Sequence, residues 1–220
     1  VACKKNEPST ENPGIPAPAG YTLNWSDEFD GQGINSGIWN FELGDGTAYG
    51  LPPGWGNDEK QIYTNSTDNA SLTNDEGNSV LAITAREGNP GEYTSAKLTT
   101  NGLKSILFGR VDIRAKVPTG NGLWPAIWML GENRSQIDWP GCGEIDMAEI
   151  LGRASSQLYT TLHYTNDEHK HGELQDMEEL NGALFSDAYH VYSIDWTPEK
   201  IVFMLDGIAI HEELIEDDMK

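Results

Sequence analysis

The segment GEIDMAEIL, residues 143–151, places three carboxylic acids in an apolar run that is otherwise typical of a buried β-strand. The acids are Glu144, Asp146 and Glu149, at offsets of two and then three residues. Alternate residues of a regular strand share a face, so Glu149 should point away from the other two acids. A helix agrees no better, because Glu144 and Glu149 would lie about 140° apart around its axis. The offset therefore indicates either an irregular strand or a third acid on the opposite face.

A β-bulge at Met147–Ala148 would resolve this offset, because one extra residue returns the next side chain to the face it would have missed. We therefore predict that all three acids project from one sheet face. With one residue taken up by the bulge, the five steps from Glu144 to Glu149 have the length of four, about 13 Å. If the two glutamate side chains lean toward each other, their carboxyl groups come to roughly 5–6 Å apart. Retaining glycosidases hold their two carboxyl groups about 5–5.5 Å apart, and inverting ones about 6.5–9.5 Å. The spacing favours the retaining chemistry.

The protonation of these acids can also be considered from the sequence. Three acids on one face cannot all ionise without cost, so the pKa of at least one must rise. If Asp146 forms a hydrogen bond with Glu144, we expect Glu144 to stay ionised while Glu149 keeps its proton near neutral pH. The spacing alone does not assign the roles. Two other interpretations stay open: a calcium site made of the same acids, and a solvated strand face with Glu149 pointing away.

The composition limits the class of partner. With 14 basic and 35 acidic residues among 220, the chain carries a formal charge of −21. Nucleic acids and anionic membrane surfaces need positive charge, so both are disfavoured as direct partners, as is a strongly acidic polysaccharide. A neutral substrate is compatible with this charge. The length suits one domain with a sizeable core.

Short alternating segments and frequent turn residues predict an all-β fold of two packed antiparallel sheets. There are 24 glycines and 11 prolines, and pairs such as Asp206-Gly207 separate the apolar runs. We find no sustained helical periodicity, and the acidic tail at 211–220 is weakly helical at best. The predicted strands are residues 79–86, 111–117, 158–164, 191–196 and 201–205.

Tryptophans surround the acid segment and could bind a sugar ring by stacking. Trp124 and Trp128 are four residues apart, so both can face the same way on a strand, and Trp139 precedes Glu144 by five residues. Burial in the core is the commoner fate of a tryptophan, and this alternative stays open for Trp124 and Trp128. Trp55 lies in a loop rich in glycine and proline, so we expect it to be exposed.

The first 20 residues are polar and proline-rich, which predicts a flexible tether in front of a domain at residues 21–220. Val1-Ala2-Cys3 resembles the end of a bacterial lipobox, in which the cysteine carries a lipid. We therefore expect lipid-anchored or secreted protein at the cell surface or in the periplasm, with a membrane contact only through Cys3. The alternative is a cysteine that lies near a trimmed terminus by chance. With only one further cysteine, Cys142, no disulfide framework is indicated.

The acid segment resembles the E-x-D-x-x-E signature of the bulged-strand glycoside hydrolases of family sixteen. Their laminarinase-type members have similar surroundings, and the likeness runs from about residue 23 to residue 207. The matching stretches are GWGNDEKQIYT at 54–64, YTSAKLTT at 93–100, FGRVDIRAKVPTGNGLWPAIWMLG at 108–131, WPGCGEIDMAEILG at 139–152 and YSIDWTPEKIVFMLDG at 192–207.

This resemblance implies a β-jelly-roll sandwich with a substrate cleft across its concave sheet. It also implies retaining endo-hydrolysis of a neutral β-glucan with β-1,3 or mixed β-1,3/1,4 linkages, without a cofactor for the chemistry. Carried over residue by residue, Glu144 matches the nucleophile, Glu149 the acid/base, and Asp146 the helper between them. The implied sugar contacts are Trp124, Trp128 and Trp139 in the cleft, Asn57 and Arg86 on the glycone side, and His163 near the scissile bond.

Some features leave alternatives open. Asn57 could instead be a loop-capping amide, and His163 a satisfied strand histidine. Relatives usually continue past the segment that matches 211–220, so we expect further C-terminal strands to be missing from the sequence. Structural calcium occurs in many relatives, but no ligand is assigned here. We expect a monomer.

Three other functions fit parts of this pattern. The same machinery could hydrolyse another neutral polysaccharide, such as an agarose-type galactan. The chain could also be a non-catalytic glycan-binding lipoprotein on the same fold, although a pure binder has no need of paired glutamates. A third alternative is a calcium-dependent adhesion module.

Overall fold

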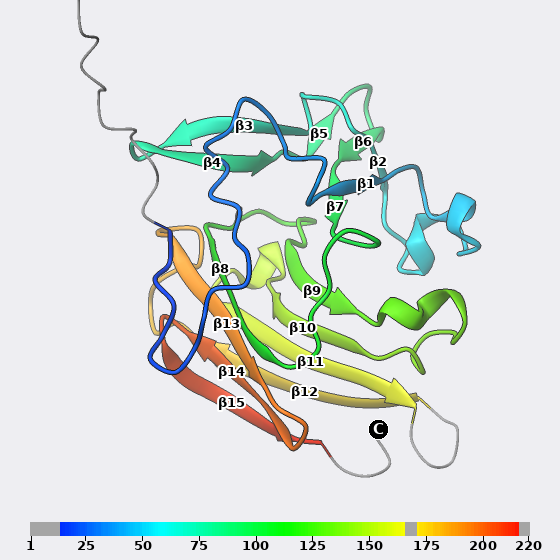
Figure 1. Ribbon diagram of the computed structural model, residues 1–220. Coiled ribbons are helices and arrows are strands. Elements are labelled where there is room, and N and C mark those ends of the chain that lie inside the picture. The colour runs from blue at the N-terminus through cyan, green and yellow to red at the C-terminus, as the bar shows by residue number, and fades with distance from the viewer. Residues whose placement is uncertain (1–13, 166–170, 216–220) are drawn as a thin grey trace, which may run out of the picture. The chain divides into compact units, whose positions relative to one another are not determined.

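The computed structural model describes residues 14–165 and 171–215 and comprises two compact units, Val1–Ser105 and Ile106–Lys220 (Figure 1). Cys3, on which the predicted lipid anchor depends, lies outside the described residues, so the anchor and the expected localisation stay predictions. Among the described residues, no helix has the length and apolar character needed to cross a membrane.

The first unit is built from short strands and turns. Its strands form a β1–β7 pair, a β2–β6–β5 sheet and a β3–β4 hairpin. The hairpin turns at Glu76-Gly77, where both residues have positive φ, as a two-residue type I′ turn requires. The elements are β1 (Asn40–Glu42), η1 (Thr47–Tyr49), η2 (Gly54–Gly56), β2 (Gln61–Tyr63), β3 (Ala70–Asp75), β4 (Asn78–Ile83), β5 (Arg86–Glu87), β6 (Tyr93–Ser95) and β7 (Lys97–Thr99).

The second unit is a sandwich of two antiparallel four-stranded sheets, ordered β12–β11–β10–β9 and β15–β14–β13–β8 (Figure 1). This arrangement confirms the predicted all-β class and is the layered core of a jelly roll. The elements are β8 (Gly109–Ala115), β9 (Ala126–Leu130), η3 (Glu132–Ser135), β10 (Glu144–Glu149), η4 (Gly152–Ala154), β11 (Gln157–Thr165), β12 (His171–Glu179), β13 (His190–Trp196), β14 (Lys200–Leu205) and β15 (Ile208–Leu214).

The core lies between these two sheets. Met147 and Leu162 from one sheet pack with Ile194, Ile201 and Phe203 from the other, and each is at most 4% exposed. Alternation explains the arrangement, because residues i and i+2 of a strand share a face. In β14 the buried positions fall at every second residue. The apolar face of each sheet is thereby covered, and the opposite face of the β9–β12 sheet is left for polar side chains.

Most of the predicted strands are confirmed, with two corrections. The strand predicted at 79–86 ends at Ile83 as β4, and Arg86 begins the separate strand β5. The weak helix allowed for the tail at 211–220 is wrong at residues 211–214, which belong to β15, while residues 216–220 lie outside the described residues. The turn at Asp206-Gly207, where both residues have positive φ, folds this segment back onto β14. Ladder hydrogen bonds then outweigh the modest helix propensity of its glutamates.

We expect Ile194→Ala to lower the free energy of unfolding by about 2–5 kcal/mol, since Ile194 is fully buried between the sheets. The matched control is Ile208→Ala, because Ile208 is 70% exposed and its truncation should cost less than about 1 kcal/mol. Urea unfolding at equilibrium measures both. Equal losses in the two variants would contradict the assignment of the core.

Candidate active site

Strand β10 contains the predicted bulge. Between Asp146 and Glu149 it advances three residues while β11 advances two, and the pairing with β9 shifts between Asp146 and Ala148. Met147 and Ala148 are both buried in the core as a result. Glu144, Asp146 and Glu149 therefore share the other face, which confirms the predicted geometry and rules out the interpretation in which Glu149 points away from the other acids.

The neighbouring strands complete this face. Residues paired laterally in a sheet point to the same side, so the partners of the three acids lie beside them. The paired residues are Ala126, Trp128 and Leu130 on β9; Tyr159, Thr161 and His163 on β11; and Glu173, Gln175 and Met177 on β12. Three acids thus occupy the middle of a face that carries aromatic and polar side chains on both sides.

Glu144 is half-buried and hydrogen-bonded at its carboxyl group. The indole Nε1 of Trp139 donates to Glu144 Oε2 at 2.8 Å. Burial and the nearby charge of Asp146 raise the pKa of Glu144 to about 7, while His163 and the Trp139 hydrogen bond oppose the rise. A hydrogen bond with Asp146 raises this pKa further. The bond therefore works against the ionised form of Glu144, opposite to the direction expected from the sequence.

Glu149 lies in a pocket on the other side of Asp146. Burial, followed by the charge of Asp146, raises the pKa of Glu149 to about 7, and a hydrogen bond from Trp124 opposes the rise. This agrees with the expectation that Glu149 holds its proton near neutral pH. The pocket has a volume of about 290 Å³ and is lined by Trp124, Glu149, Leu151, Tyr159 and Gln175.

Asp146 lies between the two glutamates and contacts His163. Asp146 is 3% exposed, and His163 Nε2 lies 3.3 Å from its Oδ2. The hydrogen bond with Asp146 is the main reason that the pKa of His163 is raised, and burial opposes it. The alternative of a satisfied strand histidine thus holds for His163 in that it has a hydrogen-bond partner, but this partner is one of the three acids. The imidazole also lies beside the Trp139 ring.

The three tryptophans predicted for the cleft are all exposed: Trp124, Trp128 and Trp139. Trp128 belongs to β9 and shares the face of the acids, while Trp124 precedes that strand. The alternative that Trp124 and Trp128 are core residues is therefore excluded. Their rings are accessible to a ligand next to ionisable groups, which is how a sugar ring can be held by stacking.

Trp55 contradicts the sequence-based expectation, since only 6% of it is exposed. Its backbone adopts the left-handed region, with φ at 57°. This conformation directs the indole inward, where Nε1 donates to the carbonyl of Gly44 at 3.2 Å. The ammonium of Lys97 lies 4.0 Å from the ring centroid. Glycine and proline around it shape a tight loop that is closed by the tryptophan.

Asn57 and Arg86 belong to the first unit and form local contacts there. Asn57 Nδ2 donates to Glu59 Oε1 at 3.3 Å, and the backbone N–H of Asn57, which caps the C-terminus of η2, donates to the carbonyl of Gly54. Arg86 Nε donates to the carbonyl of Asp68 at 2.8 Å. Both side chains are exposed. The loop-capping alternative for Asn57 thus has support, and sugar contacts by both residues stay predictions.

Sequence reasoning missed residues of this face on β11 and β12. Tyr159 and Gln175 line the pocket, and neither was identified. Alternation within the predicted strand 158–164 could have revealed Tyr159, because it shares the face of His163. Strand β12 was not predicted at all, since its sequence HGELQDMEE contains few apolar residues and only Leu174 packs against the core cluster of Met147.

Two groups of described side chains could hold a metal ion: Glu144 with Asp146 and His163, and His163 with His171 and Glu173. Calcium prefers six to eight oxygen ligands. Because each group includes histidine, neither offers the all-oxygen set of a calcium site, and the interpretation of the acids as a calcium site is unsupported. Structural calcium elsewhere stays a prediction.

Comparison with known proteins agrees with this geometry. Residues 56–220 match the model of the glycosyl hydrolases family 16. The chain is 36% identical to glucan endo-1,3-beta-glucosidase A1 of Niallia circulans, covering 90% of this chain and 30% of that protein. It is 39% identical to a beta-glucanase of Rhodothermus marinus, over 84% of this chain and 63% of that protein. It thus spans under two thirds of the length of either relative.

A solved structure shows the same likeness. The laminarinase from Flavobacterium sp. UMI-01 superposes with a TM-score of 0.78 at 35% identity, over 90% of this chain and 82% of that one. Because residues 56–220 match the family model, and because the bulged strand and its three acids agree with that match, the chain belongs to the glycosyl hydrolases family 16 and is of the laminarinase type.

Proposed function

We propose that this chain is a retaining endo-β-glucanase that cleaves β-1,3 or mixed β-1,3/1,4 linkages. The observation that carries the proposal is the bulge in β10, which gathers two glutamates around Asp146 on an exposed face. Both glutamates have a pKa of about 7, so near neutral pH one can be ionised while the other is protonated. A pair in those two states is what retaining hydrolysis requires.

Glu144 is assigned the role of nucleophile and Glu149 that of acid/base. In the first step the Glu144 carboxylate attacks the anomeric carbon while Glu149 gives its proton to the departing glycosidic oxygen, which leaves a glycosyl ester on Glu144. In the second step Glu149 takes a proton from water, the water oxygen bonds to the anomeric carbon, and Glu144 is released. The Trp139 N–H stabilises the carboxylate of Glu144 before attack and after release.

Asp146 and His163 both influence the protonation of the two glutamates. Asp146 repels negative charge on either glutamate, so its field disfavours the form in which both are ionised. His163, when protonated, offsets part of this field at both glutamates. Only the form with Glu144 ionised and Glu149 protonated is productive, and a field that disfavours double ionisation helps to keep one proton on the pair.

The substrate class follows from the exposed tryptophans and the net charge. Trp124, Trp128 and Trp139 offer rings for stacking around the acids, while the charge of −21 disfavours anionic polymers. The first relative is named an endo-1,3-beta-glucosidase and the Flavobacterium protein a laminarinase. These support a neutral β-glucan in preference to the agarose-type alternative, and the intact acid pair disfavours the non-catalytic binder.

We expect Glu144→Gln and Glu149→Gln each to lower kcat/KM on laminarin by at least about 10²–10⁴-fold, because each removes a group that reacts or transfers a proton. Glu132→Gln, a change of the same kind at an exposed residue of η3, is the control and should retain normal turnover. Near-full activity of Glu144→Gln would refute the assigned chemistry.

The same assay distinguishes the substrates. Laminarin, mixed-linkage glucan and agarose are incubated in parallel, and product sizes are read by chromatography. An endo-glucanase releases a range of oligosaccharides from the glucans from the start. Cleavage of agarose alone would favour the galactan alternative, and retention of polymer without any product would favour the binder.

The pH dependence of kcat/KM should be a bell with its maximum near pH 7. Glu144 must be ionised, so activity falls as pH drops below its pKa, and Glu149 must be protonated, so activity falls as pH rises above its pKa. Removing the indole donor in Trp139→Phe should raise the pKa of Glu144 and move the acid limb to higher pH. Trp124→Phe should instead raise the pKa of Glu149 and move the alkaline limb to higher pH.

The two phenylalanine variants serve as controls for one another. Each variant should move one limb of the pH profile and leave the other limb in place. This holds even if the substitution also changes the maximal kcat/KM. Movement of the same limb in both variants, or of neither limb, would contradict the assignment of the two hydrogen bonds.

A further inference from the structure

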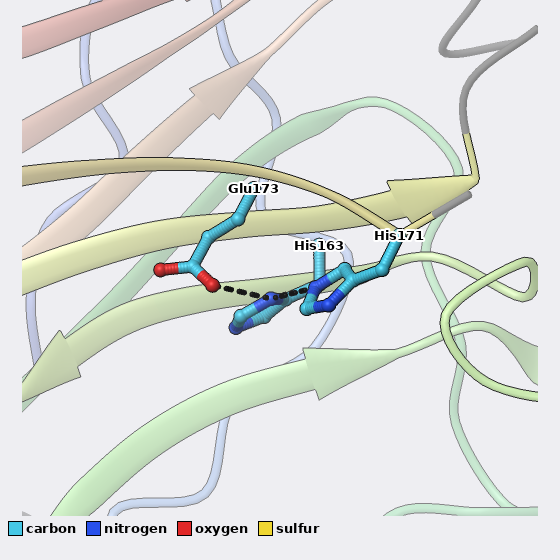
Figure 2. A group of neighbouring side chains, drawn as sticks. All are labelled: His163, His171 and Glu173. Carbon is cyan, nitrogen blue, oxygen red and sulfur yellow. Dashed lines mark hydrogen bonds and ion pairs between the residues drawn. The ribbon is translucent and has the colours of Figure 1, made fainter. Parts of the chain in front are cut away.

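We propose that His163, His171 and Glu173 form a binding site for a divalent transition-metal ion such as Zn²⁺, and that its occupancy inhibits the neighbouring acids. Figure 2 shows these three side chains converging from β11 and β12. His163 lies directly opposite Glu173, and His171 is opposite Thr165, two positions along. All three side chains therefore project from the face that carries Glu144, Asp146 and Glu149.

The distances suit one small ion. His163 Nδ1 lies 2.9 Å from His171 Nε2 and 3.9 Å from Glu173 Oε2, and the three ligand atoms lie within 4.8 Å of one another. A tetrahedral zinc ion with bonds of about 2.0–2.1 Å holds its ligand atoms about 3.3 Å apart. The distances from His163 to the other two ligand atoms differ from that value by about half an ångström. His171 and Glu173 are exposed, so neither is fixed by burial in the core.

Asp146 prepares His163 for this role. It lies on Nε2 of His163 at 3.3 Å, which favours a proton on Nε2 and leaves the lone pair of Nδ1 directed toward His171 and Glu173. A carboxylate behind a histidine is the usual support of a metal-binding imidazole, because it fixes the tautomer and the ring orientation. Without an ion, the two imidazoles share a hydrogen bond. A metal ion would take the place of the shared proton.

The donor set selects the class of metal. Two imidazoles and one carboxylate suit zinc, copper or nickel, whereas magnesium and calcium prefer oxygen ligands. The fourth position is left for water. Trp139 forms one wall of the site, with its ring centroid 4.7 Å from that of His171 and 5.6 Å from that of His163, while its indole N–H is bonded to Glu144.

The inhibitory effect rests on the proposed function. The ion would stand on the face that carries the three acids. It would also fix His163 and, through ring packing, Trp139, both of which border Glu144.

The test is calorimetric titration of the tag-free protein with ZnCl₂ in a buffer that does not chelate metals, together with laminarin hydrolysis with and without Zn²⁺. We expect one ion to bind per chain and turnover to fall, with recovery on adding EDTA. His171→Ala and Glu173→Gln should each weaken zinc binding by about 10–100-fold or more. The fall in turnover on adding Zn²⁺, measured against the zinc-free turnover of the same variant, should shrink in both. Glu179→Gln, on the same strand, is the matched control and should bind zinc as the parent does. Circular dichroism confirms that each variant is folded.

The possible results separate the claims. Absence of zinc binding to the parent chain, or binding that neither His171→Ala nor Glu173→Gln weakens, would overturn the site. Binding that depends on these residues but leaves turnover unchanged would overturn the inhibition. If Glu144→Gln hydrolyses laminarin normally while zinc binding still depends on His171, the proposed function fails and the metal site stands.

Discussion

The extra residue in β10 is the constraint on which the site depends. A regular strand would turn Glu149 into the sandwich core and Ala148 out of it, and burying an unpaired carboxyl group costs several kcal/mol. The bulge avoids this conflict by turning two consecutive residues, Met147 and Ala148, toward the core. The core thus holds the backbone irregularity in place, since both residues are fully packed there, and the acids take their positions from it.

Asp146 links the parts of this face electrostatically. It is the most buried of the three acids, its charge contributes to the raised pKa of both glutamates, and it is the main cause of the raised pKa of His163. A single carboxylate therefore influences the protonation of three neighbours, with burial the larger cause for the two glutamates. The arrangement is tolerable because Asp146 has the imidazole as a partner, whereas an unpaired buried charge would be far more costly.

The sequence predicted the central strand of the site more fully than its borders. The offset between Glu144, Asp146 and Glu149 admits few backbones once the strand is recognised, so the bulge could be located to two residues. The burial of Trp55 could not be predicted, because it depends on a left-handed backbone conformation and on Lys97 from a distant strand. Strand β12 escaped prediction for a related reason: its ladder to β11 stabilises it, and its side chains give little periodic signal.

His163 connects the two groups of ionisable side chains, since its ring has one nitrogen for each. Nε2 faces Asp146, and Nδ1 faces His171 and Glu173. A proton or ion on Nδ1 therefore changes the charge close to Asp146 and to both glutamates, on which the charge of His163 acts directly. The effect needs no movement of the backbone, because β10, β11 and β12 are adjacent in one sheet. The proposed control of the acids by a cation thus depends on the strand order and on the two ring nitrogens of His163, which have different partners.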